Sequence, residues 1–300
     1  MRKLACLCRL QTGTIPRGTG IRWVDYARKV TVVNSDGQAT CMGVDFWDAD
    51  NLIGYAWAFG GDWFSPESYP TGVVDQVTLV TPQNIEAYEA LASLKAETGV
   101  RPGGRIPSAF PIGGANSFFT GNVGMWIDAT ELVSAAKNPA VADFKWGLAP
   151  FPFPVNGKRE GTFSWSGAYA GISADSRHPD EAWRLIAYLT ADTTDQAVRD
   201  ASYMNPRRSF WMRRINDWLS EGLSALGSRE LQQVTFGALE RALPLPRVTM
   251  VGADEVWKSV QQFVVPALGG RTSVKGALEQ AQSVAEGRVV EYTKQNVGGN

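Results

Sequence analysis

The sequence predicts an α/β protein with two lobes, and three observations lead to this prediction. Three hundred residues exceed the length of one typical domain. Hydrophobic residues make up 44% of the chain and charged residues 20%, a balance typical of a globular protein with a sizeable core. Along the chain, segments with helical periodicity alternate with short apolar segments typical of buried strands.

The N-terminal part of the chain is expected to form a helix, a strand and a second helix. The first helix covers residues 23–30, a turn with the sequence NSDG follows at 34–37, and the strand covers 39–46. Residues 49–59 are apolar and rich in small side chains, which favours a helix that stops at the two glycines that follow.

A loop and a long helix come next. Residues 62–80 contain two prolines and a glycine, and we expect a loop there. Thr81 is a good N-cap residue and Pro82 suits the first helical position, so a helix is expected from there to about Gly99. Residues 102–114, which are rich in glycine and proline, are expected to form another loop.

The segment 115–128, ANSFFTGNVGMWID, combines a short helix with a strand. The helix closes on Gly121, and the strand covers 123–127 and ends at Asp128. In α/β sheets, ligands bind beyond the ends of the strands. The polar end of this strand is therefore a candidate binding position.

The rest of the chain is mostly helical. Strands are expected at 144–148 and 169–174. A helix over 179–189 follows His178, which is expected to be a loop residue, and one face of this helix carries Ala182, Leu185, Ile186 and Leu189. The remaining expected helices cover 211–226, 229–243, 256–267 and 274–286. The two prolines of PLPRV at 244–248 favour extended geometry, and we expect a hinge there.

Tryptophans beside acidic side chains are the residues that suit a sugar. Carboxylates bind the hydroxyl edges of a sugar, and aromatic rings stack on its weakly apolar faces. Such pairs, and a tryptophan between two serines, give as candidate ligand-binding residues Trp47, Asp48, Trp63, Asp128, Trp165 and Trp257. A packing role in the core competes with this role for every tryptophan, and we expect Trp146 and Trp183 to be core residues.

Other classes of function have little support. The formal net charge of -1 gives no electrostatic basis for binding nucleic acid or an anionic membrane. A single histidine excludes a multi-histidine metal site, and we expect neither a metal nor a cofactor. The chain has no GxSxG, P-loop or GxGxxG motif, so we expect no enzymatic activity. No apolar run approaches the roughly 20 residues of a transmembrane helix.

The three cysteines do not predict a disulfide framework. Cys6 and Cys8 are too close in sequence for an ordinary disulfide, and Cys41 is expected to be unpaired.

Seven segments of the chain share their order with one protein family. They are RWVDYARKVT, FGGDWF, TPQNIEAYEALASLKAETGV, ANSFFTGNVGMWID, KWGLAPFPFP, GAYAGISADSRHPDEAWRLIAYLT and GGRTSVKGALEQAQ. In this order they resemble the extracellular solute-binding proteins, family 1, of ABC sugar importers, the class that includes maltose-binding protein.

The resemblance implies a type II periplasmic-binding-protein-like fold, in which two lobes joined by a hinge close on a ligand. It implies that residues 23–166 and 249–300 form the second lobe, and that 167–248 hold the hinge and a remnant of the first lobe. Residues 1–22 would be an atypical N-terminal segment.

The resemblance also implies a function. The protein would be the extracytoplasmic substrate-binding component of an ABC transporter, and it would bind a sugar or oligosaccharide between its lobes for uptake. Its partners would be the carbohydrate and the permease subunits, and its location would be the periplasm or the extracellular face of the membrane. The full-length protein would be a monomer.

The chain departs from the family at its N-terminus. Family members carry a secretory signal and a first lobe before the segment that begins here at Trp23. We therefore expect an N-terminally truncated chain that lacks most of the first lobe, either as a fragment or because that lobe is supplied elsewhere. Residues 1–300 alone are expected to bind sugar weakly or not at all.

Two alternatives remain open. A binding protein for another solute, such as a polyamine, a peptide or glycerol phosphate, would share the fold, although a phosphate would favour arginines or helix N-termini in the cleft. A glycoside hydrolase would use paired carboxylates, which DFWDAD at 45–50 offers. The order of elements, however, lacks the repeated β/α units of a glycosidase barrel.

Overall fold

The structure is a computed structural model of the chain, and it describes residues 20–33, 35, 39–46, 52–98, 123–127, 163–164, 171–191, 207–220, 229, 231–232, 236, 243–244 and 246–296. The chain divides into two compact units. The first unit is formed by Met1–Asp128, Ala149–Phe163 and Ala238–Asn300, and the second by Ala129–Leu148 and Ser164–Gly237. The lobe boundaries expected from the sequence stay a prediction.

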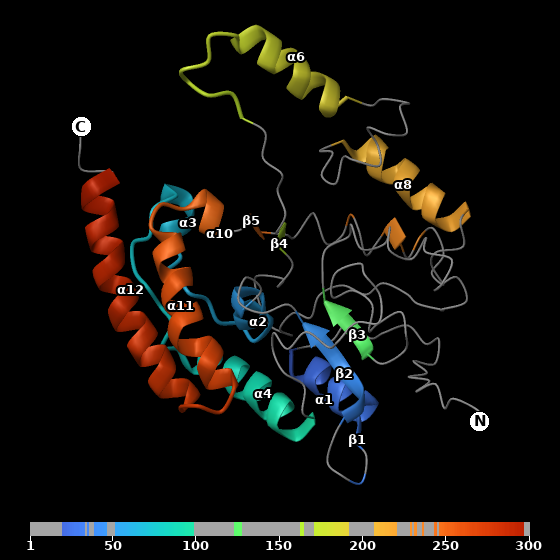
Figure 1. The fold of residues 1–300 in the computed structure, drawn as a ribbon, viewed down its shortest axis with the longest axis vertical. Coiled ribbons are helices and arrows are strands. Elements are labelled where there is room, and N and C mark those ends of the chain that lie inside the picture. Colours follow the sequence, from blue (N-terminus) through green and yellow to red (C-terminus); the bar gives the residue numbers. More distant parts are fainter. Residues whose placement is uncertain are drawn as a thin grey trace. The chain divides into compact units, whose positions relative to one another are not determined.

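A three-stranded sheet lies in the first unit, with the order β1-β2-β3 (Figure 1). Its strands are β1 (Val32–Val33), β2 (Ala39–Phe46) and β3 (Val123–Ile127). β1 pairs antiparallel with β2, whereas β2 and β3 are parallel. Met42 lies opposite Val123, and Phe46 lies opposite Ile127. β2 and β3 therefore end side by side at the same edge of the sheet.

The bounds of β2 and β3 confirm the prediction from the sequence. β1 was not predicted, because a strand of two residues has too few positions for a periodic pattern.

Helix α1 (Gly20–Val30) packs on this sheet where two glycines leave room for it. A Cβ on Gly43 of β2 would overlap the backbone of Ala27, and a Cβ on Gly124 of β3 would overlap the side chain of Val30. The Gly43 N–H donates to the Thr31 hydroxyl at 3.0 Å, which ties the end of α1 to β2. The helix expected at 23–30 is confirmed.

The rest of the described first unit is mostly helical. Its helices are α2 (Leu52–Ala58), α3 (Ser68–Thr71), α4 (Pro82–Thr98), α10 (Pro246–Thr249), α11 (Ala253–Leu268) and α12 (Val274–Asn296). Every residue of α2 is buried, and α11 lies beside α12 (Figure 1).

The Asn84 N–H donates to the Thr81 hydroxyl at 3.1 Å, which confirms the expected start of α4. The helices expected at 49–59, 256–267 and 274–286 are confirmed as α2, α11 and α12, the last of which continues to Asn296.

The segment expected to be an extended hinge contains a helical turn. Strand β5 (Leu243–Pro244) pairs with β4 (Phe163–Ser164), and α10 begins at Pro246. The expectation of extended geometry is therefore wrong from Pro246 on. The fixed φ of proline suits the first position of a helix as well as it suits an extended segment. The hinge role of 244–248 stays a prediction.

Two long helices are described in the second unit. They are α6 (Pro179–Leu189), with the predicted bounds, and α8 (Arg208–Ser220), which confirms the helix expected from residue 211 over its described part. Side chains of α8 form a small core, whose buried members are Ile215 and Trp218, together with Leu231 and Phe236. The described residues at 229, 231–232 and 236 are helical, as expected for 229–243.

Two expectations for the second unit are wrong. Residues 171–174, the described part of the strand expected at 169–174, form no strand. Trp183, expected in the core, is 61% exposed on α6. The local pattern predicts an apolar helix face or a strand, but it says nothing about which segments pack on them. The strand expected at 144–148 and Trp146 lie outside the described residues.

Cys41 of β2 is buried and disulfide-bonded, so the expectation that it is unpaired is wrong. The other two cysteines, Cys6 and Cys8, lie outside the described residues. Spacing along the chain could not reveal the bond, because it says nothing about which distant segments meet in space.

Candidate functional site

The structure describes two of the six candidate ligand-binding residues, Trp63 and Trp257, and both belong to the first unit. The other four, Trp47, Asp48, Asp128 and Trp165, lie outside the described residues.

The Asp62 carboxylate holds the turn that leads into Trp63. It accepts hydrogen bonds from the Trp63 N–H at 2.7 Å and the Phe64 N–H at 3.3 Å. Its two oxygens also lie 2.8 and 2.9 Å from the Tyr69 hydroxyl, which donates to them. Asp62 is therefore engaged in fixing the backbone that presents Trp63.

The Trp63 side chain is fixed by a buried hydrogen-bond chain. Its indole Nε1–H donates to the Tyr88 hydroxyl at 2.6 Å, and this hydroxyl donates to the Leu52 carbonyl at 3.0 Å. Burial raises the pKa of Tyr88 well above its ordinary value; the hydrogen bond from Trp63 opposes this shift and the nearby Asp62 charge adds to it. The phenol is therefore held neutral.

Trp63 and Trp257 pack against each other. Their ring centroids are 4.6 Å apart with an interplanar angle of 62°, an edge-to-face arrangement. Phe64 stacks on Trp257 at 6.5 Å and 25°. Trp63 is 0% exposed and Trp257 is 1% exposed, so neither ring face is open to a ligand in this conformation. Ligand contact by these two residues stays a prediction.

The indole N–H of Trp257 has no acceptor among the described residues. A buried donor of this kind usually has a partner, because without one it loses its hydrogen bonds to water and gains none in the protein. An indole N–H donates only, so the group that matches it is an oxygen acceptor.

Asn84 and Tyr88 are the supporting residues that the sequence reasoning missed. The Asn84 amide nitrogen lies 2.7 Å from the Asp62 carbonyl and 2.9 Å from the Thr78 carbonyl, so Asn84 joins the turn to the start of α4. Their positions in the first two turns of a predicted helix carry no signal that separates them from ordinary helix residues.

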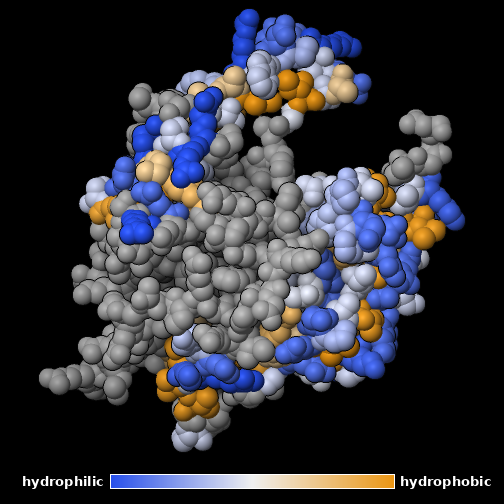
Figure 2. Space-filling model, turned by 180° about the vertical axis from the view of Figure 1, so that it is seen from behind, coloured by the Kyte–Doolittle hydropathy of each residue, from blue (hydrophilic) through white to orange (hydrophobic). Residues whose placement is uncertain are grey.

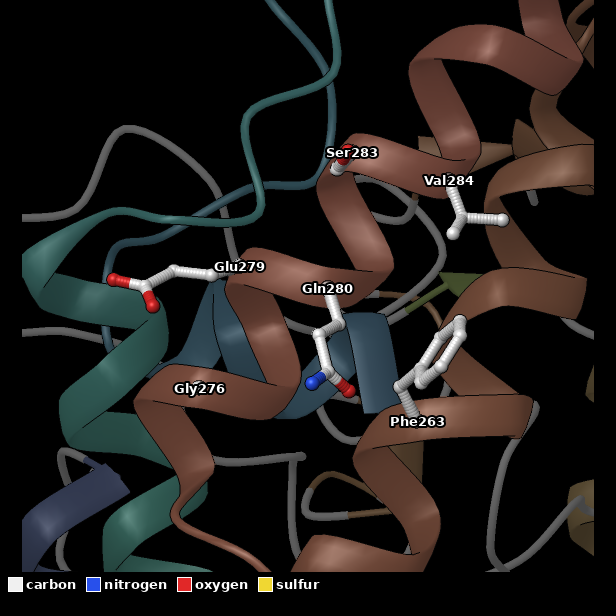
Figure 3. A pocket seen from close by; sticks show the side chains of 6 residues that line it. All are labelled: Phe263, Gly276, Glu279, Gln280, Ser283 and Val284. Atoms are coloured by element: carbon white, nitrogen blue, oxygen red, sulfur yellow. The ribbon is translucent and has the colours of Figure 1, made fainter.

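A shallow hollow of about 430 Å³ lies elsewhere on the first unit, between α11 and α12 (Figure 3). Its lining residues are Phe263, Gly276, Glu279, Gln280, Ser283 and Val284. None of the six candidate residues lines it. It is an open groove between two packed helices, and nothing in its lining singles it out as a binding site.

The described residues contain no group of three or more His, Cys, Asp and Glu side chains that could hold a metal ion.

In the described part of the chain, none of the helices has the length and hydropathy that crossing a bilayer requires.

Residues 19–196, more than half of the chain, match the profile of a protein family described as bacterial extracellular solute-binding protein. This family binds solutes without catalysing a reaction, so the expectation of a non-enzyme is confirmed.

Solved structures with the same fold include three whose ligands are named. The maltose/maltodextrin-binding domain MalE of Bdellovibrio bacteriovorus, bound to maltotriose, is 18% identical over 93% of this chain and 68% of its own, with a TM-score of 0.61. A solute-binding protein of Thermotoga lettingae with α-D-tagatose is 17% identical over 91% of this chain and 65% of its own, with a TM-score of 0.60. A solute-binding protein of Agrobacterium vitis with D-mannitol is 21% identical over 93% of this chain and 67% of its own, with a TM-score of 0.58.

These likenesses confirm the expected α/β fold of the type II periplasmic-binding-protein class. The chain spans about two thirds of the length of these structures.

Proposed function

This chain belongs to the family of bacterial extracellular solute-binding proteins, and we propose that it binds a neutral sugar or oligosaccharide for uptake through an ABC transporter. The proposal extends family membership, which gives a solute-binding role, to a class of solute. It rests on one structural observation, the common end of β2 and β3, and on the residue types that follow these strands.

The parallel strands β2 and β3 end in register, with Phe46 opposite Ile127. The chain leaves β2 directly into Trp47 and Asp48, and it leaves β3 directly into Asp128. Residues that follow parallel strands enter the same edge of the sheet, which is where α/β folds bind ligands. We propose that these three residues contact the solute, together with Trp165.

The types of these residues favour a neutral carbohydrate. Carboxylates accept hydrogen bonds from hydroxyl groups, and tryptophan rings cover the apolar face of a sugar. An anionic solute such as glycerol phosphate would be repelled by Asp48 and Asp128. The solved structures that carry maltotriose, α-D-tagatose and D-mannitol support the same class of ligand, since all three are polyhydroxylated and uncharged.

For Trp257, a candidate ligand-binding residue from the sequence, we propose a polar contact. Its buried indole N–H has no described acceptor, and a sugar hydroxyl oxygen would supply one. For Trp63, whose N–H is already bonded to Tyr88, we propose contact through the ring alone, after the packing against Trp257 opens.

The location and the protein partner belong to the same proposal. The disulfide at Cys41 suits an oxidising compartment, and this supports the periplasm or the extracellular face of the membrane. The permease subunits of an ABC transporter would recognise the ligand-bound state of the protein.

Ligand-observed NMR by saturation transfer tests the proposal, because it detects weak, rapidly exchanging binding directly on the ligand. The probes are maltotriose and D-mannitol as neutral carbohydrates, putrescine as a polyamine, and glycerol 3-phosphate as an anion. We expect saturation transfer to at least one carbohydrate and none to putrescine or glycerol 3-phosphate. Transfer only to a charged probe would contradict the proposal.

The same samples test the alternative of a glycoside hydrolase. Spectra of maltotriose recorded over a day should show no maltose or glucose. Release of either sugar, lost in Asp128→Asn, would support hydrolysis in place of transport.

A further inference from the structure

Trp63 and Trp257, the two described residues of the candidate site, are held in place in different ways. The indole N–H of Trp63 donates to the Tyr88 hydroxyl at 2.6 Å. Its backbone is bonded on both sides, because its N–H donates to the Asp62 carboxylate at 2.7 Å and its carbonyl accepts from the Thr78 N–H at 2.8 Å. Hydrogen bonds therefore fix both the backbone and the ring of Trp63.

Packing holds the side chain of Trp257. Its indole N–H has no acceptor among the described residues, and its ring contacts Trp63 and Phe64 at centroid distances of 4.6 and 6.5 Å. The backbone of Trp257 is part of the regular helix α11, so the freedom that remains lies in its side-chain torsions. Turning this ring breaks no hydrogen bond of its own N–H, whereas turning the ring of Trp63 breaks the bond to Tyr88.

The unpaired N–H of Trp257 is unfavourable because the ring is buried. Trp183 on α6 makes the contrast, since it is 61% exposed and Figure 2 shows hydrophobic side chains of this helix at the molecular surface. An exposed indole N–H can donate to water. Trp257 is only 1% exposed, so its N–H reaches neither water nor a described acceptor. An outward turn toward an oxygen acceptor would give this N–H the partner it lacks.

We propose that Trp257 is the moving ring of the site and that Trp63 is its fixed ring. In the solute-free protein Trp257 packs over Trp63. The side chain of Trp257 turns away from Trp63 and Phe64, and its N–H then donates to a hydroxyl oxygen of the bound solute. The turn uncovers the ring of Trp63, which Tyr88 keeps in place for the apolar face of the solute. The identity of the solute rests on the proposed function, whereas the turn itself occurs in the solute-free protein as well.

A ring that moves in this way makes the site cover itself. A solute binds only to the fraction of molecules in which Trp257 has turned, and the apparent affinity is lower than the intrinsic affinity by that fraction. The packing of Trp257 against Trp63 and Phe64 therefore competes with the solute.

Hydrogen exchange of indole N–H groups tests the turn without any solute. The 300-residue chain is transferred to D₂O and followed by ¹H–¹⁵N NMR, with the two indole signals assigned by Trp63→Phe and Trp257→Phe. Turning exposes the indole N–H of Trp257 to water while its backbone N–H stays bonded in α11. We expect the protection factor of this indole to be at least about tenfold lower than those of its own backbone amide and of the Trp63 indole. Equal protection of the three groups would overturn the inference.

Trp218 of α8 serves as the matched control. Its indole N–H is also buried without a described acceptor, but it lies outside the candidate site. Relative to its own backbone amide, we expect the Trp218 indole to be protected at least about tenfold more than the Trp257 indole. If the two indoles exchange equally readily by this measure, the lack of an acceptor explains both, and the inference fails.

A second measurement adds maltotriose or D-mannitol and records saturation transfer and the indole signals in one sample. Where transfer occurs, the Trp257 indole signal should shift and gain protection, while the Trp63 indole keeps its own. Transfer with an unchanged Trp257 indole would overturn the inference and leave the proposed function standing. Transfer only to putrescine or glycerol 3-phosphate would contradict the proposed function and leave the solute-free turn unaffected. In a sample without transfer, the exchange measurement alone decides.

Discussion

The indole N–H of Trp63 donates a hydrogen bond of 2.6 Å to the hydroxyl of Tyr88, which in turn donates to the carbonyl of Leu52 at 3.0 Å. This chain of bonds joins the turn after α2, the helix α4 and the start of α2 itself. All three groups are buried, so the bonds have no competition from water.

Replacing Tyr88 with phenylalanine keeps the ring and removes the hydroxyl. The indole N–H and the Leu52 carbonyl then lose their shared partner inside the core, and we expect the free energy of unfolding to fall by about 1–3 kcal/mol. Urea denaturation followed by circular dichroism measures the change. Tyr188→Phe, at an exposed position of α6, should change it by less than about 0.5 kcal/mol. Equal effects in the two variants would contradict the role assigned to Tyr88.

Stability should fall at alkaline pH because of the same tyrosine. Burial raises the pKa of Tyr88 in the folded state, whereas in the unfolded chain this phenol ionises near its ordinary value of about 10. Tyr88 therefore contributes fully to the free energy of unfolding below about pH 10. As the pH rises further, the free energy of unfolding falls by about 1.4 kcal/mol per pH unit. Urea titrations at several alkaline pH values, compared with Tyr88→Phe, isolate this slope. Parallel curves for the two proteins would contradict the prediction.

Two glycine substitutions should act in opposite directions. A Cβ at Gly43 would overlap the backbone of Ala27, which cannot move without shifting α1, so Gly43→Ala should destabilise the protein by about 1–3 kcal/mol. Gly287 lies in α12 with open space around it, and Gly287→Ala should stabilise the protein by about 0.5–1 kcal/mol. Thermal unfolding measures both. A Gly43→Ala variant that unfolds at the same temperature as the wild type would show that α1 does not approach the sheet as closely as described.

The sequence predicted those elements whose local pattern is strong. β2, β3 and α6 have the expected bounds, because apolar periodicity marks the strands and Pro179 marks the start of the helix. β1 and β5 were missed, since each has only two residues. The helical turn at Pro246 and the disulfide of Cys41 were also missed, because the first depends on neighbouring structure and the second on a segment distant in sequence.

In the candidate site, too, local sequence patterns predicted some features and missed those that depend on distant segments. The acidic residue beside it, Asp62, helped to make Trp63 a candidate ligand-binding residue. In the structure the carboxylate holds the local turn and the ring packs on Trp257, a residue far away along the chain. No local pattern could reveal that contact, just as none could reveal that Trp183, on the helix most clearly predicted, is exposed. The fold followed from local patterns, whereas the burial of single side chains depends on which segments meet.

The most direct test of the proposed function compares the wild-type protein with Asp128→Ala in saturation-transfer titrations of the carbohydrate that gives the strongest signal. A hydrogen bond to a charged acceptor contributes about 1.5–3 kcal/mol, so the variant should bind about ten to a hundred times more weakly, or give no signal. Asp25→Ala, which removes an exposed carboxylate from α1, should bind as the wild type does. Unchanged affinity in a folded Asp128→Ala protein would contradict the proposal that the common end of β2 and β3 forms the sugar site.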